Sequence, residues 1–337
     1  MPEDGCDLVV VGASAGGVEA LVRFAQALPP GFPAPILVVL HVPATGPSLL
    51  PDILTRAGPL PATHAVDGDE LRGGHIYVAP PDMHMVVTNK HVELNRGPRE
   101  NGHPPAIDPL FRTAALAYGN RVAGVVLSGT LDDGTAGLSA IKLHDGATLV
   151  QDPDEALYPG MPLSAIEFVE PHHVETIDEL VHTLVRLAST ATGRPGKEAT
   201  MDPAPDASAE EAQPGEIAPF SCPDCGGTLW ETTDGGVVSY RCRVGHAYTM
   251  NALVASHEDS LEKALWSAYR ALEEKAAMSR RVARRLAERG RSLSAQRLQR
   301  QADGAARQAE TLKAVLDELQ PPPDLGASAA NAQSRSS

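Results

Sequence analysis

The sequence predicts an α/β protein: a doubly wound, mostly parallel sheet with an edge hairpin, then a small cysteine-rich ribbon and a C-terminal α-helical hairpin. Three observations predict this fold class. Residues 1–192 alternate short apolar runs with helical patterns, which is typical of a parallel sheet covered by helices. Three of the four cysteines cluster between residues 220 and 250. After residue 250, apolar side chains recur at alternating intervals of four and three, as they do in paired helices.

The predicted strands of the first domain are near-continuous apolar runs, which suits strands that are buried on both faces. They comprise residues 8–12, 36–40, 75–79, 122–128 and 147–150, and helical patterns at 18–27 and 109–118 lie between them. Two shorter runs at 85–88 and 91–94, joined by Asn89 and Lys90, predict a hairpin on one edge of the sheet.

The rest of the chain is predicted to form four segments. Residues 193–219 are rich in Pro, Ala, Asp and Glu without an apolar period, so a flexible linker is expected there. A ribbon module follows at 220–250, then a helical hairpin at 251–320 and a disordered tail at 321–337. The helices suit either a hairpin packed on itself, with a turn near 289–292, or an intermolecular coiled coil. The expected seam consists of Leu261, Leu265, Ala268 and Leu272 in the first helix and Leu298, Ala302, Ala305, Ala309, Leu312, Leu316 and Leu319 in the second.

Composition narrows the functional classes. The net charge of −15 argues against nucleic acid as the main partner, because phosphate binding depends on positive charge. No run approaches the ~18 apolar residues that a membrane helix needs, and residues 1–7 carry acids where a signal peptide would carry bases. We therefore expect a cytoplasmic protein without membrane insertion. Residues 280–300 hold eight arginines and one acid, which predicts either a solvated helix face or a docking surface for an acidic partner.

Three residues with complementary chemistry follow predicted strands. Ser14 lies in the turn Gly12-Ala-Ser-Ala-Gly-Gly17, His41 follows the second strand, and Asp133 comes in the loop after residues 122–128. Because reactive groups gather at the carboxyl ends of parallel strands, we expect the three side chains to meet. They are the residue types of a nucleophile, its general base and the carboxylate that orients the base.

Each of these residues also has an ordinary structural explanation when taken alone. Ser14 could cap a helix, His41 could be a loop histidine, and Asp133 could serve a turn. A magnesium site at Asp132 and Asp133 is a further alternative, but no phosphate loop with its lysine accompanies it. The joint placement favours nucleophilic catalysis, with backbone N–H groups at the helix start, including that of Ala15, available to an oxyanion.

Six segments strengthen this interpretation. In chain order they are Gly12-Ala-Ser-Ala-Gly-Gly17, Leu40-His-Val-Pro43, Tyr77-Val-Ala-Pro-Pro-Asp-Met-His84, Pro105-Ala-Ile-Asp-Pro-Leu-Phe-Arg112, Leu127-Ser-Gly-Thr-Leu-Asp-Asp-Gly134 and Gly160-Met-Pro162. With these segments, residues 6–185 resemble the catalytic domain of the chemotaxis methylesterase CheB family. The order Ser, His, Asp differs from the Ser, Asp, His order of ordinary α/β-hydrolases. The resemblance implies hydrolysis of glutamyl methyl esters on methylated chemoreceptor-like proteins with release of methanol, and some relatives also deamidate glutamine.

The resemblance also implies residue roles. The family's catalytic serine, histidine and aspartate fall on Ser14, His41 and Asp133, and a backbone donor to the oxyanion falls on Thr130. The chain departs from the family where a Gly-Met-Gly run is replaced by Gly129-Thr130-Leu131, so an altered loop is expected there. Typical members begin with a phosphorylatable receiver domain. The serine turn lies too near the N-terminus for one here, so we expect either constitutive activity or another mode of regulation.

The cysteine-rich module is predicted to bind structural zinc. Cys222-Pro-Asp-Cys225 forms a knuckle, and Cys242 and His246 follow with three residues between them. Three thiolates and one imidazole suit tetrahedral zinc, and four protein ligands leave no open coordination position for catalysis. The alternative is that these cysteines bind no metal. No cofactor is expected for catalysis itself.

The sequence thus predicts a serine carboxylic-ester hydrolase, a protein-glutamate methylesterase that acts on a chemoreceptor-like substrate together with chemosensory signalling partners. A second hypothesis is a catalytically weak regulatory protein that docks signalling partners through the ribbon and helices. A nucleotide-binding protein using the glycine turn is the third. An intact set of Ser14, His41 and Asp133 favours the first.

Overall fold

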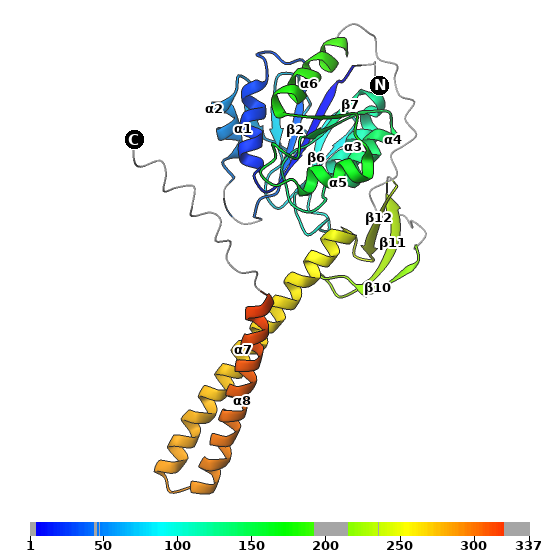
Figure 1. Ribbon diagram of the computed structural model, residues 1–337. Coiled ribbons are helices and arrows are strands. Elements are labelled where there is room, and N and C mark those ends of the chain that lie inside the picture. Colours follow the sequence, from blue (N-terminus) through cyan, green and yellow to red (C-terminus); the bar gives the residue numbers. More distant parts are fainter. Residues whose placement is uncertain (1–4, 44–45, 47, 192–214, 235, 320–337) are drawn as a thin grey trace. The chain divides into compact units, whose positions relative to one another are not determined.

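The computed structural model describes residues 5–43, 46, 48–191, 215–234 and 236–319 (Figure 1). The predicted tail and most of the predicted linker lie outside these residues. The chain divides into two compact units, residues 1–254 and 255–337. No helix among the described residues is both long enough and apolar enough to cross a membrane.

The first unit is built on a seven-stranded sheet in which every neighbouring pair is parallel. The order is β3-β4-β2-β1-β7-β8-β9, so the first strand lies in the middle, with β2, β3 and β4 on one side of it and β7, β8 and β9 on the other. This confirms the predicted doubly wound fold. The strands are β1 (Leu8–Ala13), β2 (Ile36–Leu40), β3 (Ala62–His64), β4 (Ile76–Val78), β7 (Val122–Val126), β8 (Ala147–Gln151) and β9 (His173–Glu175).

Helices cover both faces of the sheet (Figure 1). The helices α1 (Gly17–Ala27), α2 (Leu50–Ala57) and α6 (Ile177–Ala191) share one apolar core with the sheet. A second core contains α3 (Ile107–Tyr118), α4 (Thr135–Leu143) and α5 (Gly160–Val169), and a short 3₁₀ turn, η1 (Gly119–Arg121), links α3 to β7. In β1, Val9 and Val11 belong to the first core and Leu8 and Val10 to the second, which explains the continuous apolar run.

The predicted hairpin forms, but its predicted place on an edge of the sheet is wrong. The strands β5 (His84–Thr88) and β6 (His91–Asn95) make a separate two-stranded sheet, and the edges of the main sheet are β3 and β9. The buried side chains of Met85 and Val87 pack in the same core as α3. The hairpin therefore covers a helix, because its alternating apolar residues provide one apolar face and no second one.

The ribbon module is a four-stranded antiparallel sheet, ordered β10-β11-β12-β13. Its strands are β10 (Ile217–Ser221), β11 (Thr228–Asp234), β12 (Val237–Cys242) and β13 (Ala247–Thr249). The first strand starts three residues ahead of the predicted boundary at residue 220. The buried apolar core is small and includes two of the cysteines, Cys222 and Cys242. So small a core contributes little stability by itself.

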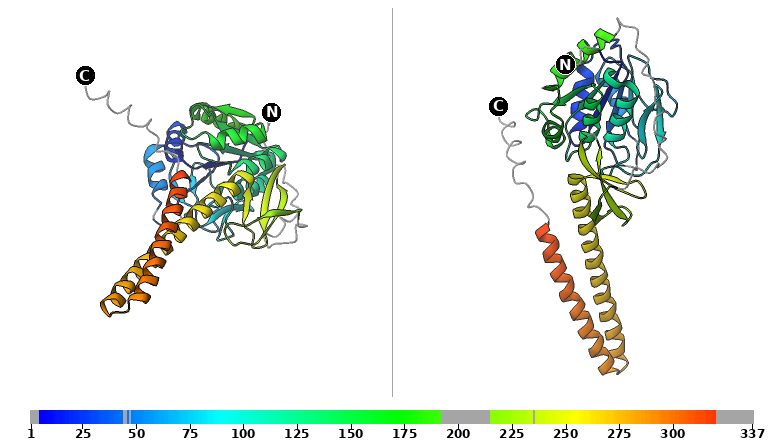
Figure 2. Two further views of the ribbon diagram at one scale, coloured as in Figure 1. Left: turned by 60° about the horizontal axis from the view of Figure 1, so that its bottom comes forward. Right: turned by 90° about the vertical axis from the view of Figure 1, so that its right-hand side faces the viewer.

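The second unit contains two long antiparallel helices that lie side by side in the views of Figures 1 and 2. They are α7 (Met250–Glu288), whose first residues belong to the first unit, and α8 (Ser292–Leu319). The chain thus forms the self-packed hairpin, with its turn where the sequence predicted it. The predicted seam needs correction at Leu261, Ala268 and Leu319, which are exposed. The buried seam instead uses small residues, namely Ala276, Ser279, Ala283, Ala295, Ala302, Ala305 and Ala309, together with Leu316.

Candidate active site

The backbone brings the serine and the histidine together at the carboxyl ends of two neighbouring central strands. Ser14 directly follows β1, and its N–H donates to the carbonyl of Ser128, beyond the end of β7 (2.9 Å). His41 directly follows β2, and its N–H donates to the carbonyl of Ala13 (3.2 Å). These bonds continue the parallel pairing past the last residues of the strands, so neighbouring strands fix both side chains on the same rim.

The side chains of Ser14, His41 and Asp133 form one hydrogen-bonded chain. The serine Oγ lies 3.0 Å from His41 Nδ1, and His41 Nε2 lies 2.7 Å from Asp133 Oδ2. A carboxylate only accepts, so the neutral imidazole carries its proton on Nε2 and leaves Nδ1 free to accept from the serine hydroxyl. His41 is 27 positions from Ser14 and 92 positions from Asp133 in the sequence. Helix α1 has no side-chain cap, so the alternative of Ser14 as a capping residue does not hold.

Asp133 is a buried carboxylate with several donors. Its Oδ2 also accepts the N–H of Ile107 (2.7 Å), and its Oδ1 accepts from the Asn101 amide (2.9 Å) and the Gly134 N–H (3.0 Å). Burial alone would raise the pKa of Asp133, but the bond and charge of His41, with the bonds from Ile107 and Asn101, hold that pKa below its ordinary value. The carboxyl therefore stays ionised beside the imidazole.

A second buried carboxyl, Asp108, lies next to this one, and sequence reasoning did not assign it a role. Its Oδ1 accepts the N–H groups of Gly134 (3.0 Å) and Gly137 (2.7 Å), which ties the start of α3 to the start of α4. Burial and then the charge of Asp133 raise the pKa of Asp108 well above its usual value. A proton taken up by this pair of carboxyls consequently resides on Asp108 and leaves Asp133 charged.

His103 is a second residue that sequence reasoning left without a function. Its ring stacks on that of His41, with centroids 3.9 Å apart and an interplanar angle of 15°. Burial, and then the charge of His41, lower the pKa of His103 to about 4. The neutral ring therefore covers one face of the His41 imidazole without adding a second charge beside it. No pattern in the sequence could have indicated this pairing, because His103 follows no strand and belongs to no periodic segment.

The two expected oxyanion donors lie in the loops beside Ser14. Within the described ranges, the backbone N–H groups of Ala15 and Thr130 donate to no protein acceptor, so both remain available. Gly129 is packed so tightly that an added Cβ would lie 3.0 Å from the Cβ of Ser14. Leu131 has a φ of 61°, the left-handed conformation that glycine adopts without strain. The loop thus keeps a glycine-type backbone although it carries a leucine.

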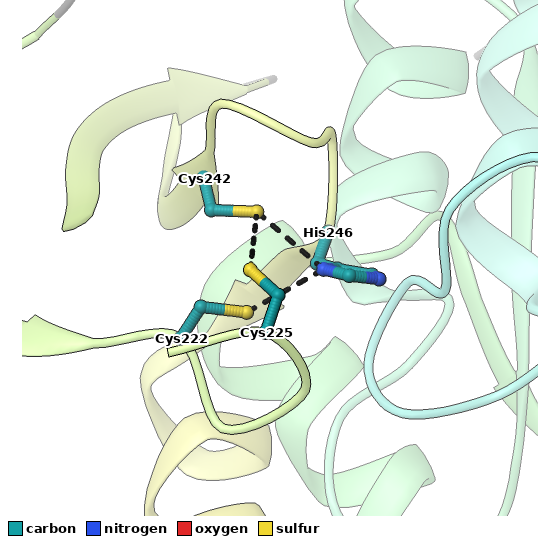
Figure 3. A group of neighbouring side chains, drawn as sticks. All are labelled: Cys222, Cys225, Cys242 and His246. Carbon is teal, nitrogen blue, oxygen red and sulfur yellow. Dashed lines mark hydrogen bonds between the residues drawn. The ribbon is translucent and has the colours of Figure 1, made fainter. Parts of the chain in front are cut away.

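The four predicted metal ligands converge in the ribbon (Figure 3). His246 Nδ1 lies 3.5 Å from the sulfur of Cys222 and 3.5 Å from that of Cys242, and the sulfurs of Cys225 and Cys242 are 3.7 Å apart. Tetrahedral zinc with its usual bond lengths separates sulfur from nitrogen by about 3.6 Å and sulfur from sulfur by about 3.8 Å. These three separations match that ion, and the histidine faces the two sulfurs through Nδ1.

The sequence also drew attention to Asp132 and to the arginines of residues 280–300. Asp132 is buried and accepts the hydroxyl of Thr249 (2.6 Å), so it does not face Ser14 or His41 as a second triad acid. The eight arginines of residues 280–300 are all exposed along the helical hairpin. Both hypotheses for that segment stay open, because a solvated face and a docking surface both require exposure.

Comparison with known proteins assigns residues 9–184 to one family. A family model described as CheB methylesterase matches residues 9–184. The chain is 43% identical over 166 residues to protein-glutamate methylesterase/protein-glutamine glutaminase 1 of Rhodospirillum rubrum, a match that covers 48% of this chain and 43% of that protein. A putative protein-glutamate methylesterase/protein-glutamine glutaminase of Leptospira interrogans is 35% identical over 182 residues, with 54% and 94% covered.

A solved structure agrees with these matches. The CheB methylesterase catalytic domain of Thermotoga maritima superposes with a TM-score of 0.51 at 32% identity, covering 54% of this chain and 98% of that one. The matched segment spans less than half the length of the Rhodospirillum rubrum relative. The likeness thus concerns the α/β domain.

Proposed function

Because the chain belongs to the CheB methylesterase family, we propose that it hydrolyses glutamyl methyl esters on a methylated chemoreceptor-like protein. The single observation that carries this proposal is the hydrogen-bonded chain from Ser14 through His41 to Asp133. Its polar atoms are oriented for proton transfer, because the hydroxyl faces a basic nitrogen and the opposite ring N–H faces a carboxylate.

In the first half of the reaction, His41 Nδ1 takes the hydroxyl proton while Ser14 Oγ attacks the ester carbonyl. The N–H groups of Ala15 and Thr130 donate to the oxygen of the tetrahedral intermediate, which in known cases contributes roughly 3–4 kcal/mol per donor. His41 then returns its proton to the methoxy group, and methanol leaves. Asp133 stabilises the imidazolium throughout, because it stays ionised.

In the second half, a water molecule attacks the glutamyl-Ser14 ester. His41 accepts a proton from the water and gives it to Ser14 Oγ as the acyl bond breaks, which leaves a free glutamate. The balance is one ester and one water consumed, and one carboxylic acid and one methanol formed. A glutamine side chain would react through the same acyl-enzyme with ammonia as the leaving group, which agrees with the second activity in the relatives' names.

We further propose that the ribbon holds a structural zinc ion through Cys222, Cys225, Cys242 and His246. These four ligands would complete a tetrahedral site, so the ion would crosslink the ribbon and would take no part in ester hydrolysis.

The decisive experiment measures methanol release from a methylated receptor fragment. Ser14→Ala should lower kcat at least 10³-fold, since removal of a nucleophile leaves only the weak catalysis of the remaining site. Ser189→Ala is the matched control, because that hydroxyl is exposed on α6 and donates to the carbonyl of Val185. Equal rates for wild type and Ser14→Ala would instead support the alternative of a non-catalytic regulator. Ammonia release from the unmethylated glutamine form tests the second activity with the same two variants.

A further inference from the structure

The ribbon module contacts the loop that carries the donors to Asp133. Strand β13 lies alongside residues 99–101: the N–H of Asn101 donates to the carbonyl of Ala247 (2.8 Å), and the N–H of Ala247 donates to the carbonyl of Arg99 (3.2 Å). Ala247 directly follows the metal ligand His246. The turn that presents the imidazole to the other ligands therefore also sets the position of β13 on this loop.

Asn101 connects this strand to the triad. Its side-chain Nδ2 donates to Asp133 Oδ1 (2.9 Å) and to Asp108 Oδ2 (3.0 Å), and its Oδ1 accepts the N–H of Thr249 (3.0 Å). An N–H group can face only the oxygen of the amide, so Thr249 decides which way the amide points. That choice turns the NH₂ group toward both carboxyls. Asn101 is only 7% exposed, so water cannot easily replace these partners.

The two residues that end β13 point to opposite sides, as neighbours on a strand do. The hydroxyl of Thr249 donates to Asp132 Oδ1 (2.6 Å), beside the triad. The hydroxyl of Tyr248 lies 4.0 Å from the sulfur of Cys222 and donates to the carboxylate of Asp224, within the metal-binding knuckle. One three-residue strand thus joins the metal ligands to the carboxyl end of the active site.

We propose that metal binding by the ribbon controls the esterase, with Thr249 and Asn101 as positioning residues for Asp133. This inference rests on the proposed function. Without the metal, the ligands Cys222, Cys225, Cys242 and His246 have nothing to hold them together, and the small core of the ribbon does not suffice to fix β13. The amide of Asn101 then loses its orientation, and the Asp133–His41 bond loses its alignment. Displacements of about 1 Å in such an arrangement cost on the order of 10²-fold in rate.

The test uses the full chain, loaded with zinc and then stripped by a chelator, with metal content measured in both states. We expect the loss of one zinc per chain to lower kcat at least tenfold, with a much smaller change in KM. The NMR signal of the His41 Nε2 proton, which is bonded to Asp133, should broaden or disappear, and zinc sulfate should restore both. Hydrogen exchange checks that the amides of β1 and β7 stay protected while those of residues 99–103 exchange faster.

Variants separate this coupling from simple unfolding. Asn101→Leu should lower kcat and weaken the His41 signal while the zinc content stays at one, and chelation should then have little further effect, since both changes remove the same connection. Thr249→Val keeps the backbone N–H that bonds to Asn101 and removes only the hydroxyl bond to Asp132, so it should lower kcat less than Asn101→Leu does, and Thr249→Ser should restore the wild-type values. Thr232→Val is the matched control, because its hydroxyl bonds to Ser239 within the ribbon.

The proposal is overturned if the metal-free chain keeps both its kcat and its His41 signal, or if chelation and Asn101→Leu act independently. The outcome does not depend on the identity of the substrate. If neither wild type nor Ser14→Ala releases methanol, the proposed function fails, but the His41 signal still reports whether the metal-loaded ribbon positions Asp133.

Discussion

Replacement of Asp133 by asparagine tests the triad with a change of one atom. The two oxygens of Asp133 serve different donors: Oδ2 accepts from His41 and the Ile107 N–H, and Oδ1 accepts from the Asn101 amide and the N–H groups of Asp108 (3.3 Å) and Gly134. An asparagine must place its NH₂ group against one of these two sets.

The donors decide which orientation the asparagine adopts. If the NH₂ group takes the place of Oδ1, the Asn101 amide and the Asp108 N–H lose this acceptor, at about 1–3 kcal/mol each, while the Gly134 N–H keeps its bond to Asp108 Oδ1. If the NH₂ group takes the place of Oδ2, His41 can move its proton to Nδ1 and accept a hydrogen bond from that NH₂ group at Nε2. Only the Ile107 N–H is then left unpaired. The second orientation is favoured, and it should lower the free energy of unfolding by about 1–3 kcal/mol.

That orientation also disables the base. A proton on His41 Nδ1 faces the hydroxyl of Ser14, so the imidazole can no longer accept from it. In the chymotrypsin-type triad the same substitution lowers kcat about 10⁴-fold for this reason, and we expect about 10³–10⁴-fold here. Methanol release gives kcat, and urea unfolding gives the stability change.

The control for this substitution is Asp145→Asn. Asp145 is exposed, and its φ of 60° is a conformation that asparagine tolerates. The control should retain full activity, with a stability change within about 0.5 kcal/mol. A kcat for Asp133→Asn within tenfold of wild type would refute the assigned tautomer and the role of the carboxylate.

Three further predictions concern the surroundings of the triad. Burial, and then the charge of His41, lower the pKa of His103 from 6.5 to about 4. Between these two pH values the unfolded chain therefore binds more protons than the folded chain. The free energy of unfolding should fall by about 3 kcal/mol as the pH drops from 6.5 to 4. His103→Phe keeps the stacked ring and should flatten this dependence in urea unfolding, and unchanged slopes would contradict the assignment. Leu131→Gly should raise the free energy of unfolding by roughly 0.5–1 kcal/mol, because the φ of 61° no longer strains a side chain; a destabilised variant would argue against strain. Gly129→Ala should lower kcat at least tenfold in the methanol assay, since the new methyl group would lie 2.0 Å from the Met161 sulfur and displace the loop; wild-type activity would show that the loop adapts.

The sequence determined the architecture of the first unit, because strands buried on both faces must be apolar at every position. Each residue of β1, β2 and β7 is buried, and the same runs are legible in the sequence without any structure. The residues at the ends of parallel strands share one rim, so the meeting of Ser14, His41 and Asp133 could be predicted from strand boundaries alone.

The ligand set of the ribbon could also be predicted, since the spacing of Cys222, Cys225, Cys242 and His246 leaves few other arrangements. In the helical hairpin, the apolar spacing of four and three could be recognised in the sequence, but the residues that face the other helix could not. The helices approach along alanines such as Ala276 and Ala302, while Leu261 and Ala268 of the predicted seam are exposed.

Only the tertiary structure decided what surrounds the triad. Asn101, His103 and Asp108 lie in a loop and a helix start that no strand end or period marks, and their partners come from other parts of the chain. Thr249 meets Asn101 across 148 residues of sequence. A local pattern records which face of an element is buried, but it contains no information about which distant segment covers a polar group, and that pairing exists only once the chain has folded.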